Sequence, residues 1–251
     1  MKKRILIALL SLFSLLCWGN DTIQDFAQGN ELYRKGQFEK AIGVYERILD
    51  SGYEAPELYF NLGNAYYKSH RIPNAILNYE KARKLKPNDD EINFNLELAR
   101  SRIVDKIHAL PEFFLLTWYR SFVQLFPASE WADWSMISFA LALLLAGIYL
   151  FSARINVRKI AFWLGALFLV VSTIDFAVSQ QAMHRQVSHR EAIVMSPTVT
   201  VRSSPDETGN ELFILHEGTK VITGDSVGDW SEVQISDGNK GWLRSADLAA
   251  I

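Results

Sequence analysis

The residues able to do covalent or metal chemistry in this chain are few and scattered. The sequence holds one cysteine, Cys17, and five histidines. His184 and His189 are the closest pair of histidines, and the further ligands that a zinc site needs are not evident beside them. Neither a His-Glu-x-x-His motif nor a Gly-rich phosphate loop after a predicted strand occurs. We therefore expect no catalytic residues, no cofactor and no metal site, and a function in binding.

A spacing of 34 residues dominates the first hundred positions. A period of this length is typical of stacked helical hairpins, which bury their apolar faces only against one another. Within the second copy, Tyr59, Leu62 and Tyr66 fall at helical spacing and predict one buried stripe. The pairs that lie 34 positions apart are Gly29 and Gly63, Asn30 and Asn64, Tyr33 and Tyr67, Ala41 and Ala75, and Tyr45 and Tyr79.

The second copy resembles the tetratricopeptide repeat (TPR). The signature positions of that family are filled, in order, by Tyr59, Leu62, Gly63, Tyr66, Ala75, Tyr79, Ala82 and Pro87. The first copy lacks the early aromatic residue and the final proline, and His70 stands where the family has a glycine between helices. The resemblance implies a TPR domain over residues 20–106. Its repeats would lie at about 22–55 and 56–89, followed by a capping helix at 90–106.

In TPR domains the first helix of each pair lines a concave groove, and the resemblance maps ten residues onto it. Their amides can pair with a peptide backbone, their aromatic rings can stack, and their cations attract acidic groups. Phe26 and Phe60 stand where carboxylate-clamping TPR domains have lysine, which argues against such a clamp. The alternative is that these residues are solvated or stacking residues repeated by descent. The ten are Phe26, Asn30, Tyr33, Arg34, Phe60, Asn64, Tyr67, Lys68, Phe94 and Arg102.

Residues 1–19 have the layout of an export signal. A cationic start precedes an apolar stretch from Ile5 to Leu16, which is too short to cross a bilayer comfortably. Gly19 then offers a small residue at a cleavage point. An uncleaved anchor and lipidation at Cys17 are the alternatives.

Two apolar segments in the middle of the chain, 131–153 and 160–179, are long enough to span a membrane as helices. The loop between them, 154–159, carries three cations, so the positive-inside rule places it in the cytoplasm and both flanks outside. The export signal independently predicts the same side for the repeats. Two buried helices of a soluble core are the alternative.

Two features beside these spans have more than one interpretation. Segment 107–130 is rich in aromatic residues but too interrupted to span, and predicts either an interfacial helix or a last helix packed on the repeats. Asp175 lies near the outer end of the second span. We expect it to reach the headgroups or to bond to Ser172 or Ser179.

From about Glu191 the apolar pattern changes to period two, with frequent turn residues. The strings 198–205, 215–221, 228–230 and 241–243 resemble a bacterial SH3 (SH3b) domain over residues 190–251. That resemblance implies an SH3-like barrel in which Trp230 and Trp242 bind a ligand; the alternative is that both close the core. We interpret His216 as structural. The apolar positions that alternate with polar ones are Val199, Val201, Val221, Ile222, Val233 and Ile235.

The ordered set of segments resembles the BatE-type proteins of the bacterial Bat (aerotolerance) family over nearly the full chain. The expected fold class is a multidomain membrane protein with an all-α TPR repeat, two transmembrane helices and a C-terminal all-β SH3-like barrel. The resemblance implies a scaffold in the bacterial inner membrane, with both domains in the periplasm and a role in stress tolerance. Its partners would be membrane lipid and other membrane or periplasmic proteins, including von Willebrand A-type Bat proteins. The alternative is a protein that binds or senses the cell wall (peptidoglycan). A net charge of −2 gives no reason to expect nucleic acid.

Overall fold

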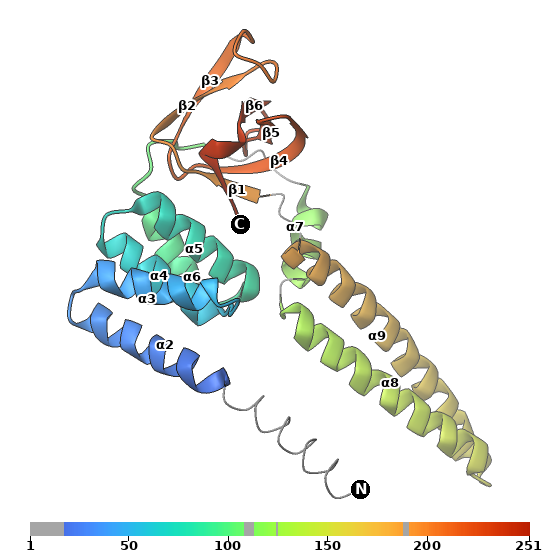
Figure 1. The fold of residues 1–251 in the computed structure, drawn as a ribbon. Helices are drawn as coiled ribbons and strands as arrows, with labels where there is room; N and C mark the ends of the chain where they lie inside the picture. Colours follow the sequence, from blue (N-terminus) through green and yellow to red (C-terminus); the bar gives the residue numbers. More distant parts are fainter. Residues whose placement is uncertain (1–17, 108–112, 124, 188–190) are drawn as a thin grey trace, which may run out of the picture. The chain divides into compact units, whose positions relative to one another are not determined.

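The computed structural model describes residues 18–107, 113–123, 125–187 and 191–251. They belong to two compact units, which are described separately: the repeat helices with the C-terminal β domain, and the helices α7 to α9. The predicted succession of helical repeats, two long apolar helices and an antiparallel β domain is confirmed (Figure 1). The predicted signal peptide lies outside the described residues, except for its last two positions.

Five helices form what we call the repeat domain. They are α2 (Trp18–Arg34), α3 (Phe38–Asp50), α4 (Pro56–Lys68), α5 (Ile72–Leu85) and α6 (Asp90–Arg100), and short turns join the first four (Figure 1). The repeated glycines let neighbouring helices approach closely. A Cβ on Gly29 would lie 2.4 Å from the Tyr45 ring, and one on Gly63 would lie 2.7 Å from the Tyr79 ring.

The turns within the two helix pairs have the same backbone conformation at equivalent positions. Gly36 has φ 73° and His70, 34 positions later, has φ 59°. His70 therefore adopts the left-handed conformation that favours glycine, which costs a non-glycine residue about 1–2 kcal/mol. This explains why the family has glycine at that position.

The helix that follows the second repeat is shorter than predicted. It ends at Arg100, whereas we expected it to reach residue 106. Residues 101–104 form turns, and the chain then runs to the β domain. There Ile107 packs against the β-domain core.

The β domain is a seven-stranded antiparallel sheet with the order β3-β2-β6-β5-β4-β1-β7. Five of the six predicted apolar positions lie in its buried core. The exception is Ile222, which is 48% exposed, because neighbouring residues of a strand face opposite sides and Val221 points inward. The strands are β1 (Glu191–Val194), β2 (Thr198–Arg202), β3 (Glu211–His216), β4 (Lys220–Val227), β5 (Trp230–Gln234), β6 (Lys240–Arg244) and β7 (Leu248–Ala250).

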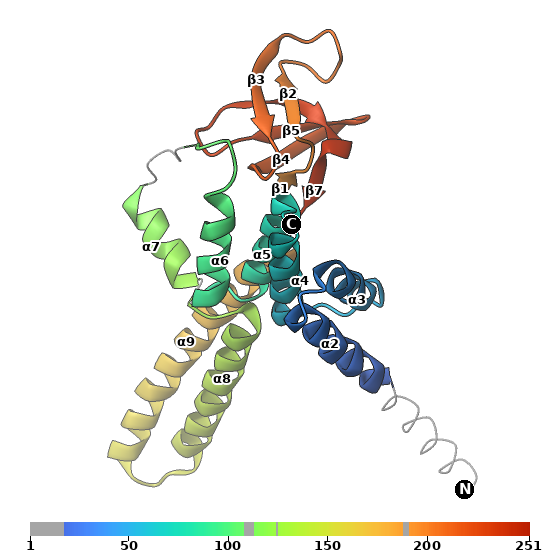
Figure 2. The same ribbon diagram turned by 90° about the vertical axis from the view of Figure 1, so that its left-hand side faces the viewer.

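The second unit is built on a hairpin of two long helices, α8 (Ala128–Phe151) and α9 (Ile155–Val187), which lie side by side in both views (Figures 1 and 2). Both helices are long and apolar enough to cross a membrane. The connection between them is shorter than the predicted loop 154–159, because α9 already begins at Ile155.

Serine side chains hold the two long helices together. The Ser135 hydroxyl donates to the Ser172 carbonyl oxygen at 3.0 Å, and the Ser172 hydroxyl donates to the Ser135 carbonyl oxygen at 3.0 Å. The Ser179 hydroxyl donates to the Ala128 carbonyl oxygen at 2.9 Å. Ser172 and Ser179 thus donate to the α8 backbone rather than to Asp175, which is itself buried in the hairpin.

A short helix, α7 (Phe114–Val123), occupies only part of the segment predicted at 107–130. The Trp131 indole N–H donates to the Val123 carbonyl oxygen at 3.1 Å, and the ring of Phe122 lies 5.3 Å from that of Trp131. These contacts fix the end of α7 to the start of α8. The other large apolar side chains of α7, among them Phe114 and Trp118, are exposed.

Candidate functional site

A hydrogen-bond network recurs with the period of the repeats. The Asn30 side-chain oxygen accepts from the Tyr45 hydroxyl at 2.7 Å and from the Asn61 amide at 2.9 Å. Thirty-four positions later, the Asn64 oxygen accepts from Tyr79 at 2.7 Å and from Asn95 at 2.9 Å. Burial raises the pKa of Tyr45 to about 12, so its hydroxyl stays protonated and remains a donor.

This network fixes the orientation of both asparagines. Because each side-chain oxygen is engaged twice, the amide nitrogens of Asn30 and Asn64 point away from those donors. Neither nitrogen donates to another protein atom within the described residues. Two oriented N–H₂ groups therefore stay available to an acceptor from outside the chain.

Both asparagines border a hollow of about 380 Å³. Four of the ten predicted groove residues line it, namely Asn30, Tyr33, Arg34 and Asn64. Ala27, Tyr45 and Asn61 complete its wall. The hollow therefore carries amide donors, aromatic edges and one cation within a small space.

The other predicted groove residues have different surroundings. Phe26 and Phe60 lie 6.1 and 6.0 Å from the rings of Tyr45 and Tyr79, and both pack against the repeat-domain core. Tyr67 is likewise partly buried against that core. These three side chains pack beneath the asparagine–tyrosine network and do not line the hollow.

The three cations of the predicted line are exposed, and of these Arg34 borders the hollow whereas Lys68 and Arg102 do not. Arg34 pairs with Glu31 on its own helix. Lys68 is the last residue of α4, and Arg102 lies in the turn beyond α6. Phe94 on α6 is 69% exposed.

The helical geometry agrees with a comparison to known families. Residues 26–90 match the family model of the tetratricopeptide repeat. The TPR fold is non-catalytic and mediates contacts between proteins, so the repeats indicate protein partners. No curated protein sequence matches the chain.

On the β domain, the two predicted tryptophans share one surface. Trp230 on β5 pairs with Arg244, and Trp242 on β6 pairs with Glu232. Ser231 beside Trp230 and Leu243 beside Trp242 are buried, so both tryptophans lie on the opposite face of the sheet, as diagonal neighbours. Both are partly exposed, which is compatible with either a ligand-binding or a core-closing role. The Arg244 guanidinium lies 5.6 Å from the centre of the Trp230 ring.

One string with the spacing of a nucleophile motif escaped the sequence reasoning. Gly224-Asp225-Ser226-Val227-Gly228 fits Gly-x-Ser-x-Gly. That motif works on a sharp strand-to-helix turn, whereas here Ser226 lies on β4 and pairs with Ser231 of β5. No hydrogen bond joins Ser226 to a histidine among the described residues. Nowhere in the described residues is a group of three or more His, Cys, Asp or Glu residues arranged to hold a metal ion.

Sequence reasoning also missed Asn61 and Asn95, whose 34-residue spacing was a readable signal. It missed Glu80 and Asp105 as well, which connect the repeat domain to the β domain. For these two no signal exists in the sequence, because their partners lie more than a hundred positions away.

Proposed function

We propose that this protein is a non-catalytic scaffold of the bacterial inner membrane that captures an extended segment of a partner protein in its TPR groove. The observation that carries this is the pair of oriented amides, Asn30 and Asn64, at the 380 Å³ hollow. An extended backbone offers carbonyl oxygens to such donors. Tyr33 and Arg34 on the same wall favour a segment that carries aromatic or acidic side chains.

The membrane location is part of the proposal and is supported by α8 and α9. Two long apolar helices in one hairpin fit a pair of membrane spans, and the serines between them satisfy one another or the backbone. Arg154, Arg158 and Lys159 lie at or near the connection between the helices, which supports a cytoplasmic bend with the TPR and β domains in the periplasm. Two periplasmic modules on one anchor raise their effective concentration for a shared partner.

The finer identity is also a proposal. The order of segments resembles the BatE-type proteins of the Bat family, so von Willebrand A-type membrane proteins are the partners to test first. That the β domain is an SH3b domain belongs to the same proposal, and its small antiparallel sheet supports it.

The groove is tested by charge reversal in the full-length protein. Arg34→Glu with Lys68→Glu should lose the membrane proteins that crosslink to the wild type in native membranes, as identified by mass spectrometry. The matched control is Lys40→Glu with Arg47→Glu on α3, which changes the charge equally at exposed positions that are not among the predicted groove residues. If both double variants recover the same partners, the groove is not the binding site.

The topology is tested separately with protease added to intact spheroplasts. The TPR and β domains should be cut, and the bend at 152–154 should be protected. Protection of either domain would contradict the proposed orientation.

A second candidate function is binding of cell-wall peptidoglycan through the β domain. The partly exposed tryptophan pair supports it, since aromatic faces with adjacent charge suit sugar and peptide ligands. Purified wall should then retain the detergent-solubilised protein, and Trp230→Ala with Trp242→Ala should release it. Ile222→Ala, which removes another exposed apolar side chain of this domain, is the control. No retention of the wild type would exclude this function.

A further inference from the structure

The outer side of α5 is covered by the β domain rather than by solvent. One face of this helix, with Ala75 and Tyr79, packs within the repeats. On another face, Ile76 is fully buried in a cluster that also contains Ile193 and Ile251 of the β domain. The last residue of the chain thus contributes to the core of the TPR repeats.

The turn between β3 and β4 lies close against the repeats. A Cβ on Gly218 would lie 2.6 Å from the Ile103 Cγ2 atom and 3.2 Å from the Ile76 Cδ1 atom. While Ile103 keeps its side chain, only a residue without one fits at this distance. Gly218 also has φ 85°, so both its conformation and its surroundings favour glycine.

Polar contacts lie beside the apolar contact between Ile76, Ile103 and Gly218. The Asp105 carboxylate accepts three hydrogen bonds of 2.7 Å from the β domain. The donors are the backbone N–H and the Nδ1–H of His216 and the Thr219 hydroxyl. His216 is therefore structural, as expected, but its role is to bind the segment that follows α6.

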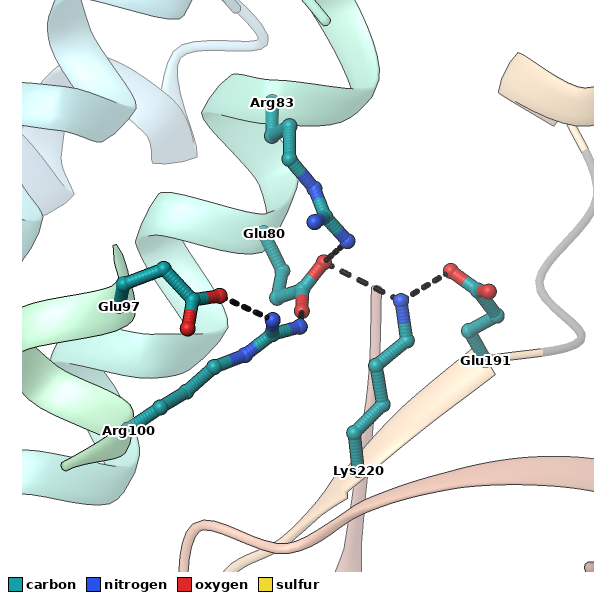
Figure 3. A network of polar contacts seen from close by, with 6 residues as sticks. All are labelled: Glu80, Arg83, Glu97, Arg100, Glu191 and Lys220. Atoms are coloured by element: carbon teal, nitrogen blue, oxygen red, sulfur yellow. Dashed lines mark hydrogen bonds and ion pairs between the residues drawn. The ribbon is translucent and has the colours of Figure 1, made fainter. Parts of the chain in front are cut away.

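A second polar cluster is centred on Glu80, whose side chain is only 1% exposed (Figure 3). Arg83 donates to its carboxylate at 2.6 Å, Lys220 of the β domain donates at 3.1 Å, and Arg100 donates as well. Lys220 also contacts Glu191 at 2.7 Å, and Arg100 contacts Glu97 at 2.7 Å. Three cations and three carboxylates are thus balanced across the interface, as a buried charge requires.

We infer that the β domain is the cap of the TPR stack, so that the two domains form one rigid body rather than two modules on a flexible linker. Stacked repeats need a terminal element that covers the apolar side of the last repeat. Helix α6 is too short to do this alone, and Ile193, Gly218 and Ile251 complete the cover. A partner then meets the repeats and the tryptophan face of the β domain at a fixed mutual position.

The interface can be tested by a disulfide in the full-length protein in native membranes. The Cβ of residue 218 would lie 3.7 Å from the Ile103 Cβ atom, which matches the separation of about 3.8 Å in disulfides. Ile103→Cys with Gly218→Cys, in a Cys17→Ser background, should oxidise almost completely. The protein is then denatured and treated with a maleimide–polyethylene glycol label, which reacts only with free thiols. Absence of label at both cysteines reports the disulfide.

The matched control is Ile103→Cys with Gly228→Cys. Gly228 also has a positive φ, 57°, but an added Cβ there contacts nothing within 4 Å. The 103/218 pair should crosslink at least about ten-fold more than the 103/228 pair, because only the first meets disulfide geometry. Equal crosslinking of the two pairs would overturn the proposal.

A second variant tests the interface if the protein with the two cysteines does not fold. Lys220→Glu places a like charge beside Glu80 and should open the interface. Proteolysis of segment 101–107 should then accelerate about ten-fold or more, because cleavage follows the population of the open form. Lys240→Glu, at an exposed position of β6, should be digested like the wild type. If Lys220→Glu is also digested like the wild type, the two domains are not coupled. Neither result depends on the groove binding a partner.

Discussion

Replacement of Glu80 by glutamine tests the interdomain cluster most directly. The substitution keeps the shape of the side chain but removes the charge that Arg83, Arg100 and Lys220 share. At 1% exposure, water cannot replace the lost carboxylate. Removing one partner of a buried ion pair costs about 3–5 kcal/mol. For a folded unit of 150–250 residues each kcal/mol lowers Tm by about 2–4 °C, so the expected fall is roughly 10 °C.

The pH dependence of this loss has a defined sign. Burial opposes ionisation of Glu80, but Lys220, Arg83 and Arg100 outweigh burial and hold its pKa below the ordinary value of 4.5. A carboxyl group with a lowered pKa in the folded state stabilises the fold above pH 4.5, and this contribution is lost as the pH falls through the folded-state pKa. The Tm difference between wild type and Glu80→Gln should therefore be full near pH 7 and shrink below pH 4.5.

The assay is thermal unfolding of the purified full-length protein in detergent, followed by tryptophan fluorescence from pH 7 to acidic pH. Glu97→Gln is the control, since Glu97 also contacts Arg100 but its side chain is 70% exposed. An exposed ion pair is worth at most about 1 kcal/mol, so this control should lose no more than about 4 °C. Equal losses in the two variants, or a difference for Glu80→Gln that stays constant with pH, would refute the reasoning.

Three further substitutions have expected effects that thermal unfolding of the same preparation can measure. Gly63→Ala should destabilise by about 1–3 kcal/mol, because its Cβ would lie 2.7 Å from the Tyr79 ring. His70→Gly should stabilise by up to about 1 kcal/mol, because it relieves a left-handed conformation at φ 59°. Asp105→Ala should cost about 2–3 kcal/mol, because it leaves the three donors of the β domain without their acceptor.

Each of these has a counterpart that should behave differently. Gly43→Ala in α3 meets nothing within 4 Å and should stabilise by up to about 1 kcal/mol, the opposite sign to Gly63→Ala. Gly36→Ala should destabilise, in contrast to His70→Gly, since Gly36 has φ 73°. Asp225→Ala, at an exposed position of β4, should have little effect. Equal effects within any pair would contradict the contact that the pair isolates.

The sequence by itself determined the features that depend on local periodicity. The 34-residue spacing gave the helix pairs, because helix packing demands small residues such as Gly29 and Gly63 at fixed intervals. Continuous apolar stretches predicted α8 and α9, and alternation predicted the strands, although Ile222 does not share the buried face of the other alternating residues. These patterns act over a few residues or one repeat, so they can be read along the chain.

The tertiary structure alone decided how side chains from distant segments are used. Asn30 appeared to be a free groove amide, yet its oxygen is engaged by Tyr45 and Asn61, and only its N–H₂ group remains for a partner. Glu80 and Lys220 lie 140 positions apart and form an ion pair only because the β domain folds back onto α5. Such contacts leave no periodic signal, since they depend on where two complete domains meet rather than on the spacing within either one.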